Sequence, residues 1–253
     1  MIVCKSPAEL AKMRAANQLV AQVLEELAAM VAPGVTTADL DAAAEARVRA
    51  AGAEPAFKGY RGYPATLCAS VNEQVVHGIP NRTALASGDI VSLDMGVKLN
   101  GYYGDSAVTV PVGTVDENVR KLLRVTREAL DKGIAQVKVG GRISDIGHAI
   151  QAHVEANGFS VVREFVGHGI GASLHEEPQI ANYGEPGRGP RLAEGMTLAI
   201  EPMVNMGKAA VRVLADGWTA VTRDGSLSAH FEHTVAVTRD GPLVLTLRPV
   251  AAL

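Results

Sequence analysis

Apolar residues recur every three or four positions in several segments of the chain, which is the spacing of amphipathic helices. In the first such segment, residues 6–9 (SPAE) combine a capping hydroxyl, a proline in the first turn and a glutamate that completes a capping box. The apolar run that follows stops at Pro33-Gly34. Further helices are predicted from about residue 36 to Gly52, over residues 116–137 and over residues 143–157.

Other segments alternate between apolar and polar residues, the period of a strand with one buried face. Residues 89–99 alternate in this way, and the turn signal Asn100-Gly101 predicts a hairpin with residues 102–110. Further strands are predicted over residues 196–204, 210–215, 218–223 and 229–238, with turns at Asp216-Gly217 and Asp224-Gly225. Helices followed by hairpins, twice over, predict an α+β fold with pseudo-two-fold halves in a single domain over residues 1–253.

The bulk composition excludes several classes of protein. With 253 residues, 47% hydrophobic and 20% charged, the chain can bury a sizeable core. A net charge of -3 gives no electrostatic reason to expect a nucleic acid or an anionic membrane as a partner. Cys4 and Cys68 form no short-spaced pair, and no export signal or membrane span is apparent, so a reducing cytoplasm is expected.

Two carboxylates come together in the predicted hairpin. If the turn has two residues, Asp105 lies opposite Gly96 and diagonal to Asp94 on the same face of the sheet. Two such carboxylates repel each other, and a divalent cation between them would remove the repulsion. For an arbitrary pair, ordinary solvated acids on an open sheet face would be the more frequent explanation.

Three further residues favour the metal-site interpretation. Glu201 in TLAIEPMV and Glu232 in AHFEHTVAV interrupt apolar strands, where an unpaired charge is unfavourable. His168 lies in FVGHGIG, whose glycines would let the backbone approach a ligand closely. Four carboxylates and one imidazole suit a pair of hard or borderline divalent ions and balance their charge.

With these residues in place, the chain resembles the type I methionine aminopeptidases, of the pita-bread fold, over nearly its full length. The matching segments are GYPATLCASVNEQVVHGIP, DIVSLDMGVKLNGYYGDSA, VGHGIGASLHEEPQI, MTLAIEPM and AHFEHT. The resemblance implies a curved antiparallel sheet covered by helices, and the short start looks like the bacterial form. It also implies hydrolytic removal of an initiator methionine by a water activated between two metals, with a preference for a small second residue.

The resemblance assigns a role to each site residue. The metal ligands would be Asp94, Asp105, His168, Glu201 and Glu232, with Asp105 and Glu232 as bridges. Glu201 would also accept the water proton, while His77 and His175 would contact the substrate. The methionine pocket would be lined by Tyr60, Tyr63, Cys68, Leu174 and Trp218.

Two positions depart from the family pattern. Leu174 stands where an aromatic residue is frequent in the family, and Gly96 stands where some members carry a hydroxyl. The expected substrates are N-terminal methionyl peptides and nascent chains, processed by a monomer with two ions of Co, Mn, Fe or Zn. Identity of the metal and contact with the ribosome stay open at this point. Two other functions compete: an Xaa-Pro peptidase of the same fold, and a non-catalytic binding protein.

Overall fold

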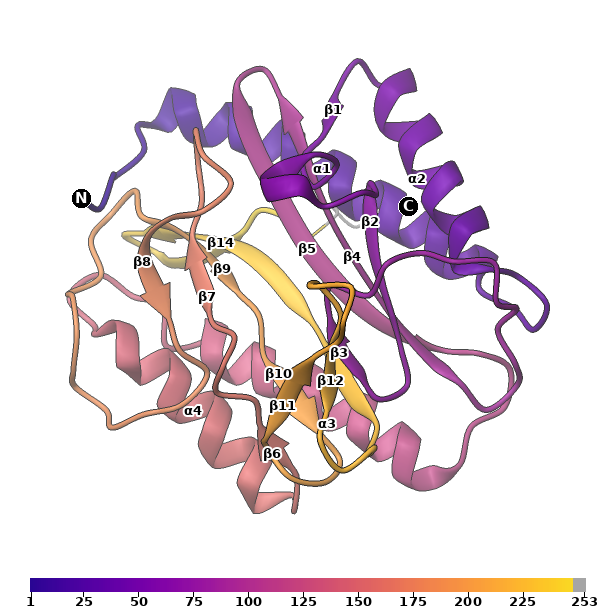
Figure 1. Ribbon diagram of the computed structural model, residues 1–253. Coiled ribbons are helices and arrows are strands. Elements are labelled where there is room, and N and C mark those ends of the chain that lie inside the picture. Colours follow the sequence, from indigo (N-terminus) through magenta and orange to yellow (C-terminus); the bar gives the residue numbers. More distant parts are fainter. Residues whose placement is uncertain (248–253) are drawn as a thin grey trace, which may run out of the picture.

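The computed structural model describes residues 1–247, in which four α-helices pack against antiparallel sheet (Figure 1). The helices are α1 (Pro7–Met30), α2 (Thr37–Ala50), α3 (Glu117–Ile134) and α4 (Ile143–Ala156). The capping box predicted at the start of α1 is confirmed, because Ser6 and Glu9 each accept a hydrogen bond from the other's backbone N–H. Within residues 1–247, no helix has both the length and the apolarity to cross a bilayer.

One large sheet runs through both halves of the fold. Its strand order is β1-β4-β5-β14-β9-β7-β8, with β2 added beside β4 and β15 beside β14. The bounds are β1 (Glu54–Pro55), β2 (Leu67–Val71), β4 (Ile90–Leu99), β5 (Tyr102–Pro111), β7 (Gly167–Gly169), β8 (Glu176–Ile180), β9 (Thr197–Ile200), β14 (Glu232–Thr238) and β15 (Gly241–Val244).

Two small sheets and one short helix complete the described chain. One sheet joins β6 (Ser160–Val161), β10 (Met203–Asn205) and β13 (Ser228–His230). The other joins β3 (Gln74–Val76), β11 (Val211–Val213) and β12 (Ala220–Thr222), seen in front of the large sheet in Figure 1. A 3-10 turn, η1 (Tyr60–Gly62), precedes β2.

The helices bury one side of the sheet in two separate cores. The apolar stripes of α1 and α2 pack on β2 and β4, where Leu93 and Met95 are fully buried. Those of α3 and α4 pack on β9 and β14 through residues such as Ile146, Ile150 and Leu198. Each half of the molecule therefore places a helix pair behind antiparallel strands, as the sequence predicts.

The hairpin register is confirmed. In the β4–β5 ladder, Gly96 pairs with Asp105 and Asp94 pairs with Ala107. Asp94 and Asp105 therefore occupy the same face, opposite the buried Leu93 and Met95, because successive side chains alternate across a strand.

Two predicted strands are each broken in the middle, which corrects the prediction. Residues 196–204 divide at Glu201-Pro202 into β9, in the large sheet, and β10, in a small one. Residues 229–238 divide at Phe231 into β13 and β14. Pro202 has no N–H for a sheet ladder, and its carbonyl instead accepts a hydrogen bond from Phe231 N–H at 3.4 Å. Glu201 and Glu232 thus both lie where the chain passes from one sheet to another.

The glycines around His168 serve packing between strands, which corrects their interpretation as ligand-approach residues. His168 lies in β7, a three-residue strand between β8 and β9 that the sequence pattern does not predict. A Cβ on Gly167 would collide with the carbonyl of Ala199, and one on Gly169 with that of Glu177. The strand therefore fits between its neighbours only because these positions lack a side chain.

Candidate metal centre and substrate pocket

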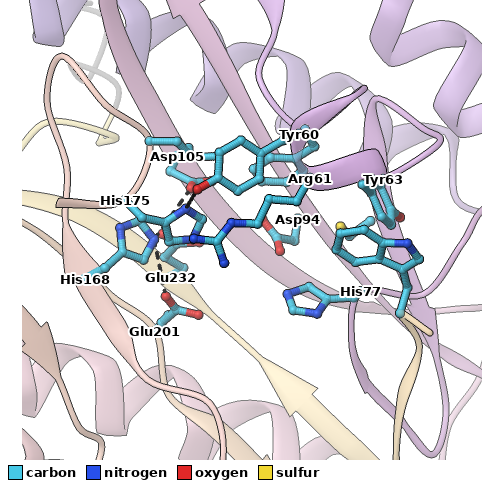
Figure 2. A pocket seen from close by; sticks show the side chains of 14 residues that line it. Tyr60, Arg61, Tyr63, His77, Asp94, Asp105, His168, His175, Glu201 and Glu232 are labelled. Atoms are coloured by element: carbon cyan, nitrogen blue, oxygen red, sulfur yellow. Dashed lines mark hydrogen bonds and ion pairs between the residues drawn. The ribbon is translucent and has the colours of Figure 1, made fainter. Parts of the chain in front are cut away.

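All of the site residues expected from the sequence line one cavity of about 170 Å³. Figure 2 shows most of them converging on this space from different elements. The cavity is lined by Phe57, Tyr60, Arg61, Tyr63, Cys68, His77, Asp94, Asp105, His168, Leu174, His175, Glu201, Trp218 and Glu232.

Five neighbouring strands supply the acid and imidazole cluster at the base of the cavity. In sheet order β4, β5, β14, β9 and β7, they contribute Asp94, Asp105, Glu232, Glu201 and His168. Glu232 is the first residue of β14 and Glu201 directly follows β9, so the strand breaks bring these two side chains to the cavity. The cluster therefore brings together residues that are far apart in the sequence, with 138 positions between Asp94 and Glu232.

Burial makes this cluster electrostatically unfavourable without a cation. Within residues 1–247, Asp94 Oδ1, Asp105 Oδ1 and Glu232 Oε1 are inaccessible and have no hydrogen-bond partner. Burial raises the pKa of Asp94 to about 7 and that of Glu201 to about 8. Burial, with the neighbouring acids adding to it, holds the pKa of Asp105 and Glu232 well above the ordinary range. A divalent ion would satisfy these oxygens and restore their charge.

The ring of His168 presents a lone pair to the carboxylates. Its Nδ1 lies 2.9 Å from the carbonyl of Gly169, which can only accept, so Nδ1 carries the proton. Burial lowers the pKa of His168 to about 4, which leaves the ring neutral at pH 7. The unprotonated Nε2 then lies 3.6 Å from Glu201 Oε1 and 3.9 Å from Asp105 Oδ2. Once a cation restores the charge of the two acids, the Nε2 lone pair and the carboxylate oxygens all face one space as acceptors, which is the arrangement of metal ligands oriented by an outer hydrogen bond.

Three of these residues come close enough to share one ion. One ligand atom from each of Asp105, His168 and Glu232 lies within 4.8 Å of the others, and all three are buried. Asp94 and Glu201 extend the same cluster along the cavity, and Figure 2 shows Glu201 beside His168. An oxygen-rich set with one imidazole fits a hard or borderline divalent metal.

Two histidines that are not in the close cluster border the cavity. The ring of His175 stacks on Tyr60 with centroids 5.2 Å apart, and its Nδ1 lies 2.9 Å from the Tyr60 hydroxyl. His77 makes edge contacts with Phe165 at 5.5 Å and Trp218 at 6.3 Å. Its backbone has φ +61°, a left-handed conformation that is strained for a bulky side chain and is found at functional sites.

The expected methionine pocket forms a mainly apolar wall beside the acids. Tyr63 packs edge-on against Trp218 at 5.2 Å, and its hydroxyl donates to the carbonyls of Leu67 and Gly78. Cys68 is 5% exposed and belongs to the same apolar group as Tyr63 and Trp218. Burial raises the pKa of the Cys68 thiol well above its ordinary value, which keeps it a neutral apolar wall rather than a thiolate.

Sequence reasoning missed several residues at this site. Phe57 and Arg61 line the cavity, and Phe165 holds the His77 ring. His230 is buried with Nε2 3.6 Å from Glu201 Oε2, and within the described chain neither ring nitrogen has a hydrogen-bond partner. Its position two residues before Glu232 in HFE was the available signal, since alternate residues of an extended segment share a face.

Packing explains one of the two positions singled out in the sequence, Gly96, while the other, Leu174, is buried. A Cβ on Gly96 would lie 2.9 Å from Phe57 Cε1 and 3.0 Å from Ala56 Cβ, so the neighbouring segment fills the space of a larger residue. Leu174 is 2% exposed and packs in an apolar cluster with Met13 and Ile170.

A curved antiparallel sheet with helices behind it and a carboxylate-histidine cluster in front defines a metal-dependent hydrolase. Residues 11–239 match the model of metallopeptidase family M24. A protein of Bacillus subtilis named methionine aminopeptidase 1 is 55% identical over 97% of this chain and 99% of its own length. The chain belongs to metallopeptidase family M24 and, within it, to the methionine aminopeptidases.

Solved structures show the same relationship. The crystal structure of methionine aminopeptidase from Thermotoga maritima is 50% identical, with a TM-score of 0.96 over 98% of this chain and 100% of that one. Prolidase from Pyrococcus furiosus is 22% identical, with a TM-score of 0.79 over 98% of this chain and 66% of that one. The second likeness shows the fold alone, and together they confirm the pita-bread architecture.

Proposed function

We propose that the chain is a dinuclear aminopeptidase that removes the N-terminal methionine from peptides and nascent proteins. The observation that carries the proposal is the buried cluster of unpartnered carboxylate oxygens facing the Nε2 lone pair of His168. The high identity to proteins named methionine aminopeptidase supports it for the substrate. A preference for a small second residue is part of the proposal.

The ligands would be Asp94, Asp105, His168, Glu201 and Glu232, with Asp105 and Glu232 as bridges between two ions. The position of the bridges is supported by the sheet, since β5 and β14 are adjacent and central. Two divalent ions of Co, Mn, Fe or Zn would lower the pKa of a shared water and polarise the scissile carbonyl.

Glu201 is the proposed acceptor of the water proton. It follows β9 at the base of the cavity, among the other proposed ligands. A carboxylate at this place could take a proton from a water held at the metal site and pass it on to the leaving amine.

The two bordering histidines are proposed to bind the peptide. When the Tyr60 hydroxyl donates to Nδ1 of His175, Nε2 carries the N–H and can donate to the oxygen on which charge develops. His77, held edge-on by Phe165 and Trp218, would contact the amide near the leaving group. Desolvation lowers the pKa of both histidines, so each acts as a neutral hydrogen-bond donor.

The methionine side chain would enter the part of the cavity lined by Tyr60, Tyr63, Cys68, Leu174 and Trp218. Aromatic edges and faces around a narrow apolar slot favour a flexible thioether over a branched side chain. Rates on the peptides Met-Ala-Ser and Leu-Ala-Ser test this point. Equal values of kcat/KM would refute methionine selectivity.

Glu201→Gln tests the chemistry. The substitution keeps the size of the side chain and removes the proton acceptor, so turnover should fall by about 10²–10⁴-fold. Glu185→Gln, at an exposed loop position, is the matched control and should leave turnover unchanged. Metal content is measured for both variants. A Glu201→Gln protein with wild-type turnover would contradict the assignment.

The remaining parts of the proposal concern metal and setting. Metal-free protein reconstituted with each of Mn, Fe, Co and Zn identifies the ions that support turnover, and titration calorimetry gives their number. We propose that the enzyme acts as a monomer in the cytoplasm on nascent chains. Light scattering tests the monomer, and co-sedimentation with ribosomes tests whether processing occurs there.

A further inference from the structure

The loop that carries Leu174 and His175 is fastened from outside the cavity by the N-terminal segment. Lys5 Nζ lies 2.5 Å from Glu176 Oε2, and Glu176 follows His175 directly. The side chain of Lys5 is 3% exposed and that of Glu176 13%. A buried lysine needs such a partner, because an unpaired charge in the interior is strongly unfavourable.

The Lys5 side chain fits closely against the loop. Its Nζ also donates to the carbonyl of Val3 at 3.0 Å, which gives the ammonium a second acceptor. A Cβ on Gly171 would collide with Lys5 Cε and Glu176 Oε1, so the ends of both side chains lie directly against this glycine. The aliphatic stem therefore packs on the loop backbone while the charge reaches Glu176.

Backbone contacts fix both ends of this arrangement. Lys5 N–H donates to the carbonyl of Gly195 at 2.7 Å, which ties the N-terminal segment to the turn before β9. Ser173 N–H donates to Glu176 Oε1 at 3.1 Å, so the two carboxylate oxygens join Lys5 to the loop. Tyr103 N–H donates to the carbonyl of Gly171 at 2.8 Å and holds the start of the loop to β5.

His175 lies directly beside this support. Its ring lies 4.2 Å from the ring of His168, centroid to centroid, and contacts the Tyr60 hydroxyl. Glu176, the next residue, is held in place because its carboxylate accepts from Ser173 N–H and pairs with Lys5 Nζ.

We infer that Lys5 is a positioning residue for the reaction, because its buried pair with Glu176 fixes the orientation of His175 toward the substrate. The inference rests on the role proposed above for His175. It links an ion pair between two residues 171 positions apart in the sequence to the orientation of a hydrogen-bond donor in the active site. A displacement of His175 by about 1 Å is enough to lower turnover by up to ~100-fold.

Lys5→Met keeps the length of the stem and removes the charge. The expected result is a fall in kcat of about 10- to 100-fold with unchanged metal content. Glu176→Gln, which keeps an acceptor for Ser173 N–H and loses the charge, should lower kcat in the same direction. Glu176→Gln also provides the test of the ion pair if the Lys5→Met protein does not fold. Lys132→Met, at an exposed position of α3, is the matched control and should change kcat by less than two-fold.

A double-substitution cycle separates positioning from general weakening of the fold. In a His175→Ala background, Lys5→Met should have no further effect on kcat, because the residue through which it acts is gone. An equal loss with and without His175 would overturn the inference, as would wild-type kcat in both Lys5→Met and Glu176→Gln. Full activity of His175→Ala would instead contradict the proposed role of His175.

Discussion

Glu201→Gln should stabilise the metal-free protein at pH 8 and have little effect at pH 5. Burial raises the pKa of Glu201 from 4.5 to about 8. The unfolded chain releases this proton near pH 4.5, whereas the folded chain keeps it up to about pH 8. Between these values the folded state binds more protons than the unfolded state, so its stability falls as pH rises.

The magnitude follows from the size of this shift. Each pKa unit corresponds to about 1.4 kcal/mol, so the part of the shift expressed between pH 5 and pH 8 lowers the free energy of unfolding by about 3–4 kcal/mol. Glutamine has the shape of the protonated acid and does not titrate. For a chain of this size the difference corresponds to a melting temperature about 10 °C higher for the variant at pH 8.

The assay is thermal unfolding of wild type and variant in chelator at pH 5 and pH 8. Comparing the two proteins at each pH isolates the contribution of Glu201, including its electrostatic coupling to the neighbouring acids Asp94, Asp105 and Glu232. Addition of Mn or Co at pH 8 should reverse the order, because a bound ion stabilises wild type and the variant has lost a ligand. Identical pH dependence of the two metal-free proteins would refute the reasoning.

Three further outcomes are expected. Gly96→Ser should lower the free energy of unfolding by about 1–3 kcal/mol in urea titration, because its Cβ would lie 2.9 Å from Phe57 Cε1; a neutral effect would show that the segment around Phe57 moves freely. Tyr60→Phe removes the hydroxyl 2.9 Å from His175 Nδ1 and should lower kcat about five-fold at constant KM, with pH-rate profiles as the check. Leu174→Ala should lower the free energy of unfolding by about 2–5 kcal/mol and reduce the Met-Ala-Ser to Leu-Ala-Ser rate ratio; an unchanged ratio would remove Leu174 from the pocket wall.

The parts of the site that could be predicted are those governed by local rules. A two-residue turn determines the pairing of its hairpin, so the sequence alone could place Asp94 and Asp105 on one face. The start of α1 could be predicted because its capping residues are local in the sequence. The roles of the more distant residues came from family resemblance, because no local rule connects β4 with His168 or Glu232.

The parts that could not be predicted depend on contacts between distant segments. The apolar pattern continues through Glu201-Pro202, and only the pairing of β9 and β10 with different sheets shows where the strand ends. His230 has the pattern of an ordinary strand residue, and only the folded chain places its ring beside Glu201. Lys5 and Glu176 leave no trace of their pairing in the sequence, since burial of an ion pair depends on the whole fold.

Through its position, strand β14 has a consequence for how the two halves of the sheet are held together. It lies between β5 and β9, where Ser106 Oγ donates to the carbonyl of Glu232 at 2.6 Å and Thr234 Oγ1 donates to the carbonyl of Asp105 at 2.8 Å. These bonds fasten the backbone of both proposed bridging residues across the seam between the two halves. An ion held by Asp105 and Glu232 would act as a cross-link between the two halves of the sheet. Removal of the metal should therefore speed exchange of the amide hydrogens along β5 and β14, because the seam would open more often without it.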